Sequence, residues 1–391
     1  MKHGGWASLT LVYLYGIVSA ASLAKAIPLQ AHISSLPGAS PALFGLFISL
    51  MAILPAIFGT LSGAVIDRLG ARPALIMAAV IGALVNGLYL VAGSFASFQV
   101  IRVVEGGIPL LTYAAAPALM IAISAPQRRS AAMALWSSYT PVGTSLGLLI
   151  SAAFAGTEQW RYAYLVHGAI FALLAVVGLA LPTAPAASVA RAGPRRSILA
   201  LLKSPAGLGP LRLASAFGVL ILLGLGVSVV MPPYLSRHYG ITLSAASGIM
   251  AVANVVMILG STLSGVFLTR GVPAANLFVA LAVFGSIAGF GVFAPWTHLG
   301  LTLSALVIWL TCTGAAMAAL ASLLPTVAGP EHRASTAGLL SQTGALTTFI
   351  TAPLWLAVLG LHQWLALFMI IPAGWGISVV LLPVQARAGT R

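Results

Sequence analysis

The chain has 391 residues, of which 60% are hydrophobic and only 6% are charged, so it is not an ordinary soluble protein, in which about a quarter would be charged. Lysine and arginine number 18 against four acidic residues, which gives a formal net charge of +14. These cations are scattered through many short connections rather than gathered into one basic patch, so we do not expect nucleic-acid binding.

Long apolar runs predict an all-α integral membrane protein, because they are long enough to cross a bilayer and lack the alternation of barrel strands. In the first half the predicted spans are 6–28, 41–66, 73–93, 98–125, 130–155 and 160–182. In the second half they are 212–235, 243–269, 273–294, 299–328, 334–359 and 363–384. The first span follows Lys2 as a signal peptide would, but another span comes next, so we expect no cleavage.

A short charged turn separates the second and third spans, reading Gly63-Ala-Val-Ile-Asp67-Arg68-Leu-Gly70-Ala-Arg72-Pro73. Asp67 can accept a hydrogen bond from a neighbouring helix N-terminus or pair with an arginine, and Gly63 permits close helix approach. Such a contact can hold one conformation and break in another, so we assign a gating role to Gly63, Asp67, Arg68, Gly70 and Arg72. The alternative is a basic turn that only sets the orientation of the chain.

Parts of this segment recur about 200 residues later. Thr60-Leu-Ser-Gly63 returns as Thr262-Leu-Ser-Gly265, and Arg68 returns as Arg270 without the aspartate. Pro126-Gln127-Arg128-Arg129 likewise matches Pro330-Glu331-His332-Arg333 at an offset of 204. The sequence therefore predicts two parallel six-helix bundles, 1–182 and 212–391, joined by a cytoplasmic linker at 183–211.

The repeated charged turn resembles the signature loop of the major facilitator superfamily of secondary transporters. Arg102-Val-Val-Glu105-Gly106-Gly107 in the fourth span is similar to the superfamily motif Arg-x-x-Gln-Gly-x-Gly, whose arginine is associated with proton coupling in drug/proton antiporters. The fifth span has Pro141-Val-Gly143 in place of the antiporters' Gly-Pro-x-x-Gly-Gly and looks more like the cyanate-permease-like group. The resemblance implies two rocking bundles whose first and fourth helices line a central cavity.

Three charged residues fall inside predicted spans, where a charge persists mainly if pairing or function supports it. Lys25 ends the first span, and Arg102 and Glu105 share a face at the start of the fourth, so all three lie at similar depth in the outer leaflet. Because the resemblance implies that the first and fourth helices line the central cavity, we expect Lys25 and Glu105 to be able to meet there. Glu105 is the first candidate for carrying or sensing the proton. In the alternative, the two cations extend to the membrane surface and Glu105 only neutralises one of them.

Other polar residues within spans are candidates for shaping specificity. The cavity-lining candidates are Tyr15, Ser19, Tyr113, Tyr139, Ser228, Trp309 and Gln342. Serine hydroxyls in membrane helices often bond their own backbone instead, and tyrosine or tryptophan near a span end often anchors the helix at the interface. We expect His167 to be a packed core histidine, with a proton role as the alternative. The lone cysteine, Cys312, cannot form an intramolecular disulfide.

The acidic residues do not form an enzyme site. Asp67, Glu105, Glu158 and Glu331 lie on four different segments, and neither a metal-ligand spacing nor a phosphate-binding glycine loop is present in the sequence. We therefore expect no catalytic activity, metal or cofactor.

Orientation follows from the basic residues, because lysine and arginine near span ends are retained in the cytoplasm. With the N-terminus inside, only Arg161 and Arg237 among the loop and tail cations fall outside. We expect both termini to be cytoplasmic. Short loops and an Ala/Gly-rich sequence favour a bacterial inner membrane protein.

The surplus of cation over acid inside the spans favours an anionic or zwitterionic solute. We predict a monomeric, multi-pass secondary transporter whose partners are a small organic substrate, protons and membrane lipid, working by alternating access and proton-coupled symport. The main alternative is proton-coupled efflux of an amphipathic drug or siderophore-like compound. A receptor that retains the fold and uncoupled facilitation remain further alternatives.

Overall fold

The computed structural model shows a helical protein. It describes residues 5–125, 128–183, 208–294, 296–327, 333–360 and 364–383. Most of the predicted linker 183–211 lies outside these residues, as do Pro126 and Gln127 and the segment from Pro330 to His332. Every element in the described ranges is a helix, which agrees with the predicted all-α membrane fold.

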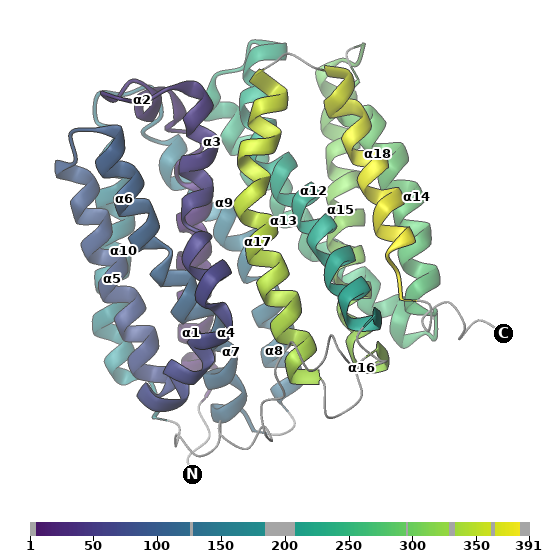
Figure 1. The fold of residues 1–391 in the computed structure, drawn as a ribbon, viewed down its shortest axis with the longest axis horizontal. Helices are drawn as coiled ribbons and strands as arrows, with labels where there is room; N and C mark the ends of the chain where they lie inside the picture. The colour runs from purple at the N-terminus through teal and green to yellow at the C-terminus, as the bar shows by residue number, and fades with distance from the viewer. Residues whose placement is uncertain are drawn as a thin grey trace. The chain divides into compact units, whose positions relative to one another are not determined.

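Helices occupy each predicted span of the first half (Figure 1). A short helix, α2 (Gln30–Ser34), follows the first span. The others are α1 (Trp6–Ala24), α3 (Pro41–Leu50) with α4 (Ile53–Leu69), α5 (Ala71–Val91), α6 (Phe95–Glu105) with α7 (Gly107–Ile123), α8 (Arg129–Ser137) with α9 (Tyr139–Ala152), and α10 (Tyr162–Val177) with the 3-10 helix η2 (Gly178–Ala180).

The second half is built from longer helices. They are α12 (Leu208–Tyr239), α13 (Leu243–Thr269), α14 (Ala274–Phe293), α15 (Leu299–Ser322) with α16 (Leu324–Val327), α17 (Arg333–Gly360) and α18 (Trp364–Val380). Within the described residues, nine segments are long and apolar enough to cross a membrane. The other three predicted spans are the second and fifth, each divided into two helices, and the twelfth, which is the shorter helix α18.

The chain forms two compact units. The first comprises Met1–Ala192 and Gly240–Ala251, and the second comprises Gly193–Tyr239 and Val252–Arg391. The described helices α1 to η2 therefore belong to the first unit together with the beginning of α13.

Three predicted single spans are broken in the first unit. The second breaks at Met51 and Ala52, the fourth at Gly106, and the fifth at Ser138. The first two breaks meet, because a Cβ atom added at Gly106 would lie 2.5 Å from the carbonyl oxygen of Met51. Glycine is required at this contact, and the broken fourth span turns the end of α6 toward α3. An apolar run alone carries no sign of such a contact between segments.

A glycine-lined contact joins α1 to α9. Gly143 and Gly147 lie four residues apart on one face of α9, and a Cβ atom at either would clash with the α1 backbone, at the carbonyl of Ile17 or of Ala21. Small residues at this spacing let two membrane helices approach closely. The contact fixes α1 within the unit and therefore sets the position of Lys25 at its C-terminal end.

Arginines cap the C-terminal ends of several helices. The last carbonyls of a helix have no partner within the helix, and lipid offers none, whereas a guanidinium carries five donors. Arg161 donates to the carbonyls of Tyr89, Leu90 and Ala92 at the end of α5. Two others bond one carbonyl each at a helix end, Arg72 to Leu179 and Arg212 to Val380. This use explains arginines that have no acidic partner.

Replacing Arg161 with glutamine tests the capping role. We expect the free energy of unfolding to fall by about 2 kcal/mol, because charged hydrogen bonds to three helix-end carbonyls are lost. Thermal unfolding in detergent measures this loss. Arg237→Gln is the matched control, since Arg237 is exposed at the end of α12. Equal melting temperatures for the two variants would contradict the capping role.

Candidate functional site

A buried ammonium group stands at the centre of a polar cluster in the first unit. Lys25 caps the end of α1, and its side chain is 1% exposed. Its Nζ donates to Oδ1 of Asn86 at 2.6 Å and to Oε1 of Glu105 at 2.6 Å. Its third contact is with Nδ1 of His167 at 3.3 Å. An ammonium has three hydrogens, so these neighbours from α5, α6 and α10 use all of them.

Glu105 is the acidic member of the cluster and is fully buried. Its Oε2 accepts from Arg102 Nη1 at 2.8 Å and from the Tyr89 hydroxyl at 3.1 Å, while Oε1 accepts from Lys25. The carboxylate therefore receives three hydrogen bonds, two of them from cations. All three bonds favour the ionised form, because an ionised carboxylate only accepts.

Arg102 is fully buried and is held by backbone as well as by Glu105. Its Nη1 donates to the carbonyl of Ser22 at 2.8 Å, and its Nη2 donates to the carbonyl of Leu23 at 3.1 Å and of Ile48 at 3.4 Å. These carbonyls lie in the last turns of α1 and α3. Arg102 thus caps two helices at their negative ends and does not extend to the surface.

Counting the three ion-paired side chains, the cluster carries one surplus positive charge. Lys25 and Arg102 are cations and Glu105 is the single anion between them. The helix ends at Ser22 and Ile48 compensate part of this charge, but a full negative charge would compensate it better. The cluster is therefore one negative charge short of neutrality.

Two neutral side chains have their orientations fixed by backbone. Asn86 Nδ2 donates to the carbonyl of Gly82 at 2.7 Å, which leaves Oδ1 to face Lys25. His167 Nε2 lies 3.0 Å from the carbonyl of Val18, and a carbonyl can only accept. Nε2 must therefore carry the hydrogen, and in the neutral ring Nδ1 presents its lone pair to Lys25.

Aromatic rings surround the ammonium group. Nζ of Lys25 lies 5.3 Å from the centroid of the Tyr89 ring and 5.1 Å from that of Tyr164, within the range of a cation–π contact. The two tyrosine rings are themselves 4.4 Å apart, and both contact Phe98. The rings separate the charges from solvent and strengthen the interactions among them.

The second half of the chain shows which residues stand at the positions that correspond to the cluster. At the offset of 204, Lys25, Arg102 and Glu105 correspond to Val229, Leu306 and Trp309, all of which are buried. Trp309 occupies a fully buried position on α15. The same kind of bundle therefore packs without charges at these positions, so the fold itself does not require the cluster.

Four other candidates in the first unit have defined contacts. Tyr15 donates from its hydroxyl to the carbonyl of Leu174 at 2.6 Å, which ties it to α10. Ser19 is buried on α1 and is adjacent to Tyr113 on α7. Tyr113 and Tyr139 have ring centroids 4.9 Å apart and are partly exposed. Tyr15 thus contacts the core of the unit, and the other three lie near one another.

The second-unit candidates are more dispersed. The hydroxyl of Ser228 on α12 shares its one hydrogen between the carbonyl of Gly224 at 2.9 Å and Oδ1 of Asn254 at 3.1 Å. Trp309 is packed in the core, and Gln342 is partly exposed on α17. Whether these residues line a common cavity with the first unit stays a prediction.

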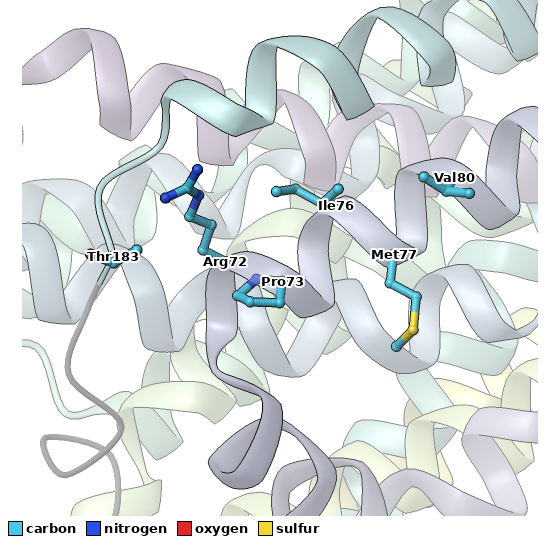
Figure 2. Close-up of a pocket in the computed structure, with 6 residues that line it drawn as sticks. All are labelled: Arg72, Pro73, Ile76, Met77, Val80 and Thr183. Carbon is cyan, nitrogen blue, oxygen red and sulfur yellow. The ribbon is translucent and has the colours of Figure 1, made fainter.

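The predicted gating segment is described in part. Gly63, Asp67 and Arg68 lie on α4, but their side chains lie outside the described residues. Gly70 has φ +88° at the junction of α4 and α5, a conformation that favours glycine. Figure 2 shows Arg72, Pro73, Ile76, Met77 and Val80 along α5, with Thr183 on a neighbouring segment. These six residues line an open pocket of about 430 Å³. The charge cluster is not part of this pocket.

Sequence analysis did not identify Asn86, Tyr89 and Tyr164 as members of the site, and it assigned His167 to the core. A signal was present, because Asn86 and Tyr89 are three apart on one helix, as are Tyr164 and His167. Polar pairs at this spacing share a helix face. The carbonyl partners of Arg102 had no such signal, because every residue has a carbonyl group.

In the described residues, no three His, Cys, Asp or Glu side chains gather as a metal site requires.

A helical membrane protein built from a duplicated bundle, with buried ion pairs in one copy, has the properties of a transport protein. The sequence matches the family model described as Major Facilitator Superfamily over residues 11–353. The chain therefore belongs to the major facilitator superfamily. It is a multi-pass membrane transporter and not an enzyme, and members of this class work by alternating access.

Solved structures show the same fold. The xylose transporter XylE from E. coli, in its inward open conformation, has a TM-score of 0.76 and 14% sequence identity, with 96% of this chain and 95% of that chain covered. A bacterial homolog to the human lysosomal transporter Spinster, in an inward-facing and unoccupied conformation, has a TM-score of 0.70 and 20% identity, covering 97% and 94%. At these identities the likeness establishes the fold alone. Among curated proteins, none matches the chain.

Proposed function

We propose that this transporter moves a small organic solute with an anionic group, or a zwitterion, together with a proton in the same direction. The observation that carries the proposal is the surplus positive charge of Lys25, Arg102 and Glu105 within a fully buried cluster. A buried charge is expensive and persists where function or pairing supports it. Here the pairing is incomplete by one negative charge, which a substrate carboxylate supplies.

Of the two cations, Lys25 is better suited to contact the substrate. Four of the five N–H groups of Arg102 donate to helix-end carbonyls and to Glu105, and among the described residues only its buried Nε has no partner. Lys25 instead bonds two neutral side chains, Asn86 and His167, besides Glu105. A carboxylate can replace a neutral acceptor at an ammonium with a gain in attraction, because charge-assisted bonds are stronger.

Proton symport accounts for the driving force. A negative-inside membrane opposes the entry of an anion by about 2.3 kcal/mol per charge at 100 mV. A proton that enters with each anion cancels this electrical work. The efflux alternative makes a different prediction, because an amphipathic cation or neutral drug does not need Lys25.

The test is proton movement in proteoliposomes on addition of small carboxylates, amino acids and siderophore-like compounds. We expect wild type to move protons with one class of carboxylate, and Lys25→Met to lose both that signal and the uptake of the compound. Arg237→Met removes one exposed cation and is the matched control, which we expect to match wild type. Full activity of Lys25→Met on every transported compound would contradict the proposal and favour efflux or facilitation.

We also propose that residues 1–182 and 212–391 act as the two moving bundles, with both termini in the cytoplasm of a bacterium and the chain working as a monomer in the inner membrane. The distribution of basic residues supports this orientation, since only Arg161 and Arg237 among the loop cations fall outside. Membership of the cyanate-permease-like group stays a prediction from the fifth span.

A further inference from the structure

We propose that His167 is the proton-binding group of the cluster and that Glu105 is its permanently ionised counter-ion. This inference deepens the proposed symport and rests on it for its role in transport. It assigns to His167 the proton-binding role for which Glu105 was the first candidate from the sequence. The geometry around each group decides between the two.

Protonation of Glu105 would neutralise the single anion that pairs with both Lys25 and Arg102. Its two oxygens accept from Lys25 Nζ, from Arg102 Nη1 and from the Tyr89 hydroxyl. These bonds use three of the roughly four lone pairs of the carboxylate, so the obstacle to a proton is electrostatic: without the negative charge of Glu105, two buried cations lose their counter-ion. Arg102 cannot move aside cheaply, because it also caps the ends of α1 and α3.

His167 can take a proton at Nδ1 at the cost of one long contact and no ion pair. Its Nε2 hydrogen is directed at the carbonyl of Val18, so Nδ1 carries the lone pair that faces Lys25 at 3.3 Å. Protonation at Nδ1 removes this one long contact and leaves the Lys25 bonds to Asn86 and Glu105 intact. Among the groups that contact Lys25, the imidazole is the one that gains a proton without disturbing an ion pair.

The charges around His167 couple this proton to an anion. Lys25 faces it from α1, and Arg102 and Glu105 face it from α6. The neutral Asn86 and Tyr89 are the polar neighbours from α5, whereas α9 and η2 contain no charged residue.

An added proton would raise the surplus charge of the cluster from one to two, which the buried site opposes. A bound carboxylate returns the surplus to one. Each ligand therefore strengthens the binding of the other by the same factor, which is the thermodynamic requirement for coupled transport.

Histidine protonation can be measured directly without a substrate. Protein labelled with 15N-histidine is titrated in lipid nanodiscs, and the His167 signals are assigned by their absence from His167→Gln. We expect a neutral ring with hydrogen on Nε2 at alkaline pH and an imidazolium at acidic pH. His298→Gln, which changes an exposed histidine at the start of α15, keeps these signals. A His167 ring that stays neutral wherever the protein is folded would overturn the inference.

Transport by His167→Gln supplies the second measurement. The glutamine amide can still donate to Val18 and accept from Lys25, but it does not take up a proton. We expect this variant to bind the transported carboxylate more weakly, to retain its exchange across the liposome membrane at raised concentration, and to lose its proton-driven accumulation. Retained accumulation would overturn the proton role of His167. Failure of the proposed symport is distinguishable, because wild type would then move no protons with any compound while the 15N titration still reports on His167.

Discussion

Replacing Glu105 with glutamine is expected to lower the free energy of unfolding by about 3–5 kcal/mol, because it removes the single anion from a buried cluster. Lys25 and Arg102 would then remain as two cations without a counter-ion. For a unit of this size the loss corresponds to a fall of roughly 10 °C in melting temperature. Thermal unfolding in detergent, followed by tryptophan fluorescence, measures it.

Removing Lys25 as well is expected to restore most of this stability. The double variant Lys25→Met/Glu105→Gln carries one buried cation, Arg102, and so returns to the surplus charge of wild type. Lys25→Met alone is expected to be milder than Glu105→Gln, since it leaves the neutral Arg102–Glu105 pair in place. If the melting temperature of the double variant is equal to or below that of Glu105→Gln, the number of surplus charges does not determine the stability of the cluster. The argument from surplus charge would then fail.

The second large effect is expected at Gly260 on α13. A Cβ atom there would clash with the backbone carbonyl of Thr311, and one at Gly314 would clash with the carbonyl of Met257. The two helices thus touch through backbone at reciprocal glycines. Gly260→Ala should cost about 1–3 kcal/mol by overpacking, and Gly260→Val should cost more because backbone cannot move aside as a side chain can.

The same helix supplies the control, because a Cβ atom at Gly265 would meet nothing within 4 Å. Gly265→Val should therefore leave packing unchanged. Cys312 reports the difference directly, since it is the only cysteine, is buried, and follows Thr311 at the contact. We expect a thiol-reactive dye to label Cys312 faster in Gly260→Val than in wild type or Gly265→Val. Equal labelling of all three proteins would show that α13 and α15 tolerate the added side chain.

The sequence was most informative about the charged residues inside the spans. Lys25 and Glu105 were expected to be able to meet because span direction puts them at similar depth and the family resemblance places the first and fourth helices around one cavity, and the structure joins them at 2.6 Å. The alternative of surface extension for Arg102 is not what the structure shows, since its guanidinium is buried against α1 and α3. The burial of Arg102 depends on where α1 and α3 end. The sequence of the fourth span carries no information about the ends of those two helices.

The sequence by itself determined the membrane class, the twelve apolar segments and the duplication, because hydropathy and repeats are properties of the residues in order. Only the tertiary structure decided the breaks at Met51 and Gly106, which depend on two backbones touching. It also decided that Asn86 and His167 complete the coordination of Lys25. These contacts join helices about 60 to 140 residues apart, and a hydrogen bond at such separation is fixed by packing and not by the periodicity of either helix.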